Sequence, residues 1–266
     1  MFSRFTRRSR AARTAPTTPR VWHGPPGARA YAIGDVHGRL DLLERMLDEI
    51  NRDRQQTGPA RDYLILLGDV IDRGPDSRGV IECLMGLPRD IRPKDLRTVF
   101  LMGNHEEMML RVLQGEPEAV HQWLTFGGYE FAQSYGVEVG KLAALYPADA
   151  AAIIRARIPA EHLAFVEDFA DSFTFGDYLF VHAGMRPGRK LAEQDTHDLR
   201  WIREDFINDD SDHGCMVVHG HTISAEVQQM DNRIGIDTGA YQTGILTALR
   251  IEGDQRRIIS VNEQDL

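Results

Sequence analysis

Cysteine is scarce in this sequence. Only two cysteines, Cys83 and Cys215, occur among the 266 residues, and they lie far apart in unrelated surroundings. Two isolated thiols exclude a metal site built from cysteine thiolates, and they favour a reducing compartment. We therefore expect the protein in the cytoplasm.

Long apolar runs are also missing. The longest strand-like run, YLILL, stops at Gly68, far short of the ~20 apolar residues that a membrane-spanning helix needs. We expect no transmembrane segment and a soluble body.

Acidic residues are absent from the start of the chain. The first thirty residues hold seven arginines and no acid, so the net charge of −9 divides into +7 there and −16 over residues 31–266. This segment lacks the apolar core of a secretory signal, and its Arg- and Ser/Thr-rich composition is that of a transit peptide or, more commonly, of a disordered basic tail. We expect such a tail over residues 1–28. The net negative charge of residues 31–266 argues against a specific nucleic-acid binder.

The composition of the whole chain, 42% hydrophobic and 27% charged residues, is that of an ordinary globular protein. It predicts one large domain over residues 29–266. Apolar runs and amphipathic patterns alternate in the first half, predicting strands at 30–34, 63–67 and 98–102, each followed by a helix, at 40–54, 77–87 and 106–113. This βαβαβα order predicts an α/β fold with a parallel sheet. Residues 115–170 read as a helical insertion or cap. From Ser172 onward, short β runs return with hairpin-like spacing.

Each of the three predicted strands ends in a glycine followed by a polar residue, namely Asp35, Asp69 and Asn104, with His37 two positions after Asp35. Ligands of open parallel sheets bind at the carboxyl ends of the strands, so these side chains should meet. Taken singly, each is more often a helix cap or a turn residue.

Two later runs, FVHAG and VVHGH, also end in histidine beside glycine, at His182 and at His219 and His221. So many polar groups at one buried edge would need partners, and a pair of divalent cations would satisfy them. Ligation by Asp, His and Asn without cysteine suits Mn²⁺, Fe or Zn²⁺.

Five motifs follow one another along the chain: GDVHG (34–38), GDVIDRG (68–74), GNHE (103–106), VHAG (181–184) and GHT (220–222). In this order they resemble the phosphoprotein phosphatases, the Ser/Thr phosphatase branch of the calcineurin-like metallophosphoesterases, and above all its small bacterial and phage members. The resemblance implies a metallophosphoesterase-type β-sandwich flanked by helices. It also implies six metal ligands, with Asp35 and His37 at one cation, Asp69 between the two, and Asn104, His182 and His221 at the other.

The same resemblance implies a catalytic set. A hydroxide bridging two divalent cations would attack phosphorus, and Mn²⁺ is the expected cation. His105, oriented by Asp72, would protonate the leaving group. Arg73 and Arg203 would bind the phosphate through their planar guanidinium groups. Taken alone, Asp72 with Arg73 could be an internal ion pair, and Arg203 an ordinary surface arginine.

Two positions of the last motif stand outside this set. His219 has no ligand role in the family pattern, and we interpret it as a supporting or structural residue. Ile223 occupies the place where other metallophosphoesterase branches carry a further histidine ligand, which favours the phosphatase branch. The Ser-Ala-Pro-Asn-Tyr loop of the large eukaryotic phosphatases has no counterpart.

Three functions are therefore in view. The first is a protein Ser/Thr phosphatase, with phosphorylated protein as its substrate. The second is a symmetrical dinucleoside tetraphosphate hydrolase, a group whose pattern usually lacks the aspartate found here at Asp72. The third is a non-catalytic phosphoprotein-binding module, which would be expected to have lost ligands. The sequence predicts no oligomeric state.

Overall fold

The computed structural model describes residues 20–87 and 96–265. Most of the expected basic tail therefore lies outside the described residues. Its last part does not behave as a tail, because Trp22 is only 4% exposed and the amide of Gly24 donates to the carbonyl of Gly253 at 2.8 Å. The folded region thus begins before residue 29, since the indole of Trp22 packs into the core.

The first sheet has the strand order β10-β9-β1-β2-β3. The strands β1 (Ala28–Ile33), β2 (Arg61–Leu66) and β3 (Arg97–Phe100) are parallel, and β9 (Ile245–Glu252) and β10 (Gln255–Asn262) join them antiparallel. In the register, Ile33 lies opposite Leu66, and Leu66 lies opposite Phe100. The three parallel strands therefore end side by side, at the edge where the sequence places its polar residues.

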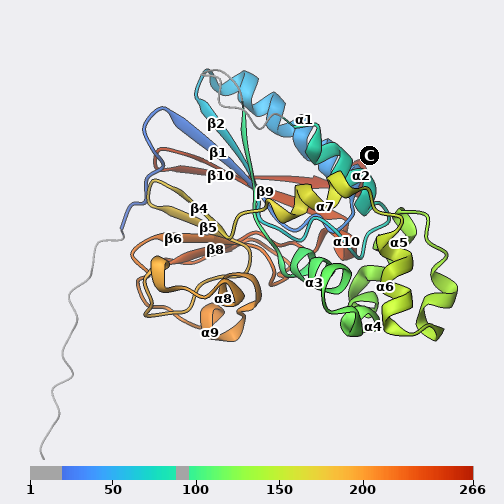
Figure 1. The fold of residues 1–266 in the computed structure, drawn as a ribbon. Coiled ribbons are helices and arrows are strands. Elements are labelled where there is room, and N and C mark those ends of the chain that lie inside the picture. The colour runs from blue at the N-terminus through green and yellow to red at the C-terminus, as the bar shows by residue number, and fades with distance from the viewer. Residues whose placement is uncertain (1–19, 88–95, 266) are drawn as a thin grey trace, which may run out of the picture.

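Three helices follow these strands, α1 (Leu40–Thr57), α2 (Ser77–Met85) and α3 (Asn104–Gln114). The helices α1 and α2 lie together along the first sheet, and α3 lies nearer the insertion (Figure 1). Tyr31 and Ile33 of β1 pack into the core that these helices share. The neighbouring Ala30 and Ala32 point to the opposite face. Burial on both faces explains why the parallel strands read as continuous apolar runs.

Residues 117–167 are helical, as expected for the insertion. They form η1 (Pro117–Ala119), α4 (Val120–Trp123), the π-helical turn η2 (Leu124–Gly128), α5 (Tyr129–Ser134), η3 (Val139–Ala144), α6 (Pro147–Arg155) and α7 (Ala160–Glu167). Figure 1 shows α4, α5 and α6 grouped beside α3. The chain then returns to the first sheet, where Ala170 pairs with Leu101.

The second sheet has the strand order β4-β5-β6-β8-β7. Its strands are β4 (Ser172–Phe175), β5 (Tyr178–Val181), β6 (Met216–His219), β7 (Gln228–Gln229) and β8 (Arg233–Gly235). The expected hairpins are present for β4–β5 and β9–β10, but β5, β6 and β8 are parallel. The hairpin interpretation was wrong there, because the link from β5 to β6 is long enough for a crossover and contains η4 (Leu191–Glu193), α8 (Thr196–Trp201) and α9 (Glu204–Ile207).

The two sheets face each other across a shared apolar core, which includes Ala30, Ile65, Phe180, Val218 and Ile251. The helices α8 and α9 cover the outer face of the second sheet. The short α10 (Ala240–Thr243) precedes β9, and η5 (Glu263–Asp265) follows β10. This arrangement is the expected β-sandwich flanked by helices.

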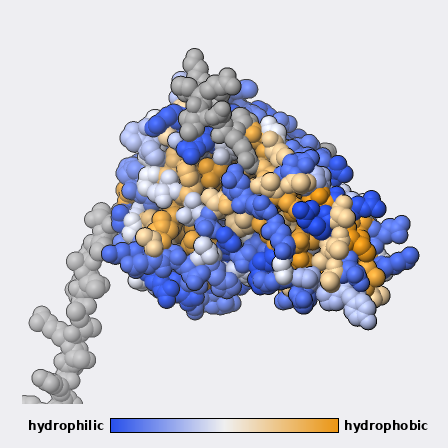
Figure 2. Space-filling model, viewed as in Figure 1, coloured by the Kyte–Doolittle hydropathy of each residue, from blue (hydrophilic) through white to orange (hydrophobic). Residues whose placement is uncertain are grey.

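The face shown in Figure 2 is mostly hydrophilic, with apolar residues between the polar ones and over the helical insertion. Within the described ranges, no helix is both long and apolar enough to cross a membrane. The apolar side chains of the helices are used instead in packing against the sheets.

Candidate active site

The loops that leave β1 and β2 are joined by backbone hydrogen bonds. The amides of Val36 and His37 donate to the carbonyl of Asp69 at 3.1 and 2.9 Å, and the amide of Gly38 donates to the carbonyl of Val70 at 2.9 Å. His37 and Asp69 have positive φ values of 45° and 47°, which are uncommon for non-glycine residues. The joined loops hold both side chains in place at the sheet edge.

Glu106 joins the loop that follows β3 to the loop that follows β2. Its buried carboxylate accepts four backbone N–H bonds, from Gly103, Asp69, Val70 and Ile71, at 2.8–3.3 Å. No role was predicted for this residue from the sequence. The signal was present in GNHE, since a glutamate in the first turn of a helix often accepts N–H bonds from the preceding residues.

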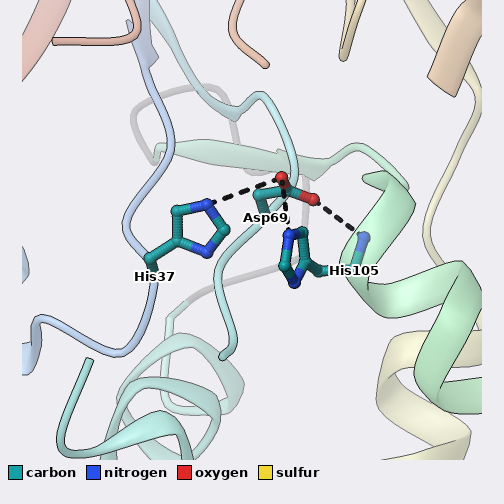
Figure 3. Close-up of side chains that lie close together, drawn as sticks. All are labelled: His37, Asp69 and His105. Atoms are coloured by element: carbon teal, nitrogen blue, oxygen red, sulfur yellow. Dashed lines mark hydrogen bonds and ion pairs between the residues drawn. The ribbon is translucent and has the colours of Figure 1, made fainter. Parts of the chain in front are cut away.

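His37, Asp69 and His105 form one group of side chains that could hold a metal ion (Figure 3). The Nε2 atoms of His37 and His105 lie 3.6 and 3.9 Å from Oδ2 of Asp69. Nδ1 of His37 donates to the carbonyl of Ile71 at 2.8 Å, which leaves the Nε2 lone pair free to bind a cation. Burial lowers the pKa of His37 to about 3, so the ring is in the neutral form that a metal requires.

Asp69, His182 and His221 form a second such group. Nδ1 of His182 donates to the carbonyl of Leu67 at 2.8 Å, and its Nε2 lies 3.4 Å from Oδ1 of Asp69 and 3.0 Å from Oδ1 of Asn104. Burial lowers the pKa of His221 to about 2, and its Nε2 has no hydrogen-bond partner among the described residues. Asp69 is shared by the two groups.

Asp35 belongs to neither of these two groups. Its buried carboxylate accepts from the amide of His221 at 3.1 and 3.2 Å, and a Cβ atom at Gly220 would lie 2.0 Å from its Oδ1. Burial and the charge of Asp237 hold the pKa of Asp35 well above its ordinary value. Asp35 therefore lies beside the second group, with its oxygens turned to the His221 backbone.

The residues present fit divalent cations. The unpartnered Nε2 of His221 and several buried carboxylates would be costly in a protein interior without a cation. The charge of Asp69 raises the pKa of His182 to about 10 although burial opposes this, so the site attracts positive charge. Nitrogen and oxygen ligands without sulfur match Mn²⁺, Fe or Zn²⁺.

His105 and Asp72 form a hydrogen-bonded pair beside this centre. Nδ1 of His105 lies 2.7 Å from Oδ2 of Asp72, and Nε2 of the same ring faces Asp69. Burial works against protonation of His105, but the charges of Asp69 and Asp72 outweigh it and raise its pKa above the ordinary value. The same Asp72 oxygen accepts a hydrogen bond from Nε1 of Trp123 at 2.9 Å. Trp123 was not predicted from the sequence.

The two arginines lie at the rim of the site. The guanidinium of Arg73 lies 4.7 Å above the ring of Tyr241, whose centroid is 5.2 Å from that of His37. The exposed Arg203 donates from Nη1 to the carbonyl of His221 at 3.4 Å. Tyr241 was missed as well, because a single tyrosine after Ala240 carries no specific signal.

His219 lies outside both histidine groups. Its Nδ1 donates to the carbonyl of Gly220 at 3.1 Å, and its ring packs edge-on against Phe206 with centroids 5.2 Å apart. Burial lowers the pKa of His219 to about 4. These contacts agree with its interpretation as a supporting or structural residue.

Comparisons with known proteins bear on this site. The chain is 29% identical over 233 residues to serine/threonine-protein phosphatase 1 of Salmonella typhimurium. The aligned region covers 84% of this chain and 91% of that protein. It is 27% identical over 227 residues to an asymmetrical bis(5'-nucleosyl)-tetraphosphatase of Bacillus thuringiensis, covering 82% and 88%.

The fold is found among solved structures too. The crystal structure of a candidate diadenosine tetraphosphatase matches with a TM-score of 0.61 and 20% identity, over 91% of this chain and 98% of that one. The family model of the calcineurin-like phosphoesterases matches residues 28–243. That span contains all five motifs and both histidine groups. The chain therefore belongs to the calcineurin-like phosphoesterases, a family of metal-dependent hydrolases.

Proposed function

We propose that this phosphoesterase is a protein serine/threonine phosphatase with a two-metal site. The observation that carries the proposal is the buried hydrogen bond of 2.7 Å between His105 and Asp72, whose histidine faces the shared ligand Asp69. An imidazole held in this way can give a proton to a departing oxygen.

The proposed metal ligands are Asp35, His37, Asp69, Asn104, His182 and His221, and the proposed metal is Mn²⁺, with Fe or Zn²⁺ as other fitting ions. Two divalent cations, when bound, supply a water of lowered pKa as the nucleophile and polarise a phosphate oxygen. The protein's part is to orient the imidazoles, through bonds such as that from Nδ1 of His37 to the Ile71 carbonyl. Asp35 would contribute its carboxylate, which accepts from the His221 amide.

Arg73 and Arg203 would bind the phosphate oxygens from two sides of the rim. Their guanidinium groups present planar pairs of N–H donors that match a phosphate. Tyr241 supports Arg73 from below. With the phosphate held, Nε2 of His105 would protonate the leaving oxygen, and Asp72 would keep Nδ1 of His105 protonated and its ring oriented.

The leaving group distinguishes the candidate substrates. The alkoxide of serine or threonine is a strong base and needs a proton as it departs, whereas a nucleotide phosphate departs as a stable anion. A buried acid pair is therefore more useful to a phosphoprotein phosphatase. Similarity to the Salmonella phosphatase over most of both chains supports the same choice.

Dinucleoside tetraphosphate hydrolysis, which the sequence suggested in its symmetrical form, is the second candidate. It is favoured by the similarity to the Bacillus tetraphosphatase over most of the chain. A purely phosphoprotein-binding module is disfavoured, because none of the six proposed ligand residues is missing from the sequence. We further propose a cytoplasmic location and phosphorylated proteins as the partners.

The test is a substrate panel with the purified protein and Mn²⁺. Phosphoserine, phosphothreonine and phosphotyrosine peptides are compared with diadenosine tetraphosphate by kcat/KM. The proposal expects the phosphoserine and phosphothreonine peptides to be cleaved most efficiently. A higher kcat/KM for diadenosine tetraphosphate would replace it with the second candidate.

A further inference from the structure

The helical insertion reaches the candidate active site through one short segment. Trp123 ends α4, and residues 124–128 form the π-helical turn η2. This segment contacts two consecutive residues of the GDVIDRG loop, Asp72 and Arg73. Both have positive φ values, 69° and 65°, and such a conformation persists only where the surroundings hold it. The segment is placed to provide that support.

Trp123 acts on Asp72. Its Nε1 donates at 2.9 Å to Oδ2 of Asp72, the oxygen that also bonds Nδ1 of His105 at 2.7 Å. Oδ1 of Asp72 is buried and has no hydrogen-bond partner among the described residues. The indole and His105 are therefore the side chains that fix the plane of this carboxylate.

The indole itself is firmly held. Trp123 and Phe131 are both 0% exposed, and their rings pack with centroids 5.4 Å apart. A Cβ atom at Gly128 would lie only 2.9 Å from the indole, so the backbone packs directly against the ring. A donor on a rigid ring sets the direction of its hydrogen bond, and with it the orientation of His105.

Gly127 acts on Arg73. Its carbonyl accepts from the amide of Arg73 at 3.1 Å. Gly127 has a φ of 114°, and a Cβ atom there would lie 2.5 Å from the Arg73 nitrogen and 2.6 Å from its Cγ. Only glycine fits this conformation and this close contact. The base of the Arg73 side chain is thereby held against Gly127, while its guanidinium lies over the Tyr241 ring.

We propose that residues 123–128 are a positioning segment for the reaction, in which Trp123 orients the Asp72–His105 pair for proton donation and Gly127 holds Arg73 for phosphate binding. The inference rests on the proposed phosphatase function of this site. Neither Trp123 nor Gly127 touches the substrate; they act through Asp72 and Arg73. The insertion is thus part of the catalytic apparatus.

Trp123→Phe tests the first half of the proposal, because it removes the N–H donor and keeps an aromatic ring. On a phosphoserine peptide kcat should fall about tenfold, a part of the ~10²- to 10⁴-fold that general acid catalysis supplies. On p-nitrophenyl phosphate, whose leaving group needs no proton, kcat should change less than about threefold. Metal content and KM should not change.

The matched control is Val120→Ala. Val120 lies on the same helix and is also 0% exposed, so its truncation weakens the packing of α4 without removing a hydrogen bond to Asp72. It should affect both substrates equally. If Trp123→Phe does not fold, a benzothiophene analogue of tryptophan at position 123 keeps the shape and removes only the N–H.

Gly127→Ala tests the second half with a different signature. The new methyl group should displace Arg73 and weaken its hydrogen bonds to the phosphate, so KM should rise about tenfold on both substrates. The ratio of the two kcat values should stay at the wild-type level. Gly140→Ala is the control, because no atom of the described residues lies within 4 Å of its Cβ position.

A double-mutant cycle separates this inference from the proposed function. If Trp123 acts through His105, adding Trp123→Phe to His105→Asn should cause no further loss of kcat. Equal defects of Trp123→Phe on both substrates, or full additivity in the cycle, would overturn the inference alone. If His105→Asn itself shows no dependence on the leaving group, the proposed function fails instead.

Discussion

At the scale of single residues, substitutions of the neighbouring Asp69 and His105 should have different effects on metal binding and on kcat. Asp69→Asn removes the charge shared by both histidine groups, so it should lower metal occupancy together with activity. His105→Asn should retain the metals and lose kcat by ~10²- to 10⁴-fold on a phosphoserine peptide, with a smaller loss on p-nitrophenyl phosphate. The measurements are metal content and kcat of both variants on both substrates.

Loss of metal in the His105→Asn variant would contradict this prediction. If His105→Asn loses its metals, then His105 is a ligand, as its place in the first group with His37 and Asp69 also allows. The acid role of His105 and the orienting role of Asp72 would then fall together.

The residues of the site differ in how far the sequence could predict them. His37, Asp69, His182 and His221 follow strands at glycines, and backbone topology alone brings such positions to one edge. Trp123 and Tyr241 could not be predicted, because their contacts depend on how an insertion and a late loop fold back onto the site. Asp35 was predicted at the site, but its hydrogen bonds to the His221 amide depend on side-chain rotation that a sequence does not encode locally.

At the scale of elements, the close approach of two loops can be tested at Gly220. A methyl group there would lie 2.0 Å from Oδ1 of Asp35, so Gly220→Ala should push this carboxylate away. We expect lower metal affinity, a loss of activity of at least about tenfold, as for other perturbed metal environments, and a folded protein. Metal titration followed by activity assays provides the measurement.

Gly140→Ala is again the matched control, since it adds the same methyl group in open space. Metal affinity in Gly220→Ala equal to that in Gly140→Ala would mean that Asp35 does not contribute to metal binding.

The strands and helices of the first half were predicted well because each parallel strand is buried on both faces and each helix has one apolar side. The expected start of α3 was at 106, whereas the helix begins at Asn104. The short helices α8 and α9 were missed, since pieces of six and four residues show too few turns for a period to be recognised. Without them, β5, β6 and β8 looked like hairpins rather than parallel strands.

At the scale of the whole molecule, Trp22 fastens the beginning of the described chain onto the core between the sheets. Trp22→Ala should destabilise the protein by about 3–5 kcal/mol and lower the Tm by about 10 °C. It should leave kcat unchanged at temperatures where the variant is folded, because Trp22 packs with the sheets and not with the site. Thermal unfolding and a phosphatase assay measure the two effects. A lower kcat at an unchanged Tm would contradict this placement.

The proposed metal ions should also stabilise the whole molecule. Burial raises the pKa of both Asp35 and Asp237, and the charge of Asp69 raises both further, so bound cations would relieve this repulsion. Because a ligand that binds only the folded state adds about 2.7 kcal/mol at one hundred times its Kd, chelation should lower the Tm by roughly 5–10 °C. It should also abolish hydrolysis of p-nitrophenyl phosphate, and added Mn²⁺ should restore both. Asp69→Asn is the control, whose Tm should respond less to the chelator. Full activity in exhaustively metal-stripped protein would rule out the two-metal proposal, and an unchanged Tm would show that the buried carboxylates are accommodated without cations.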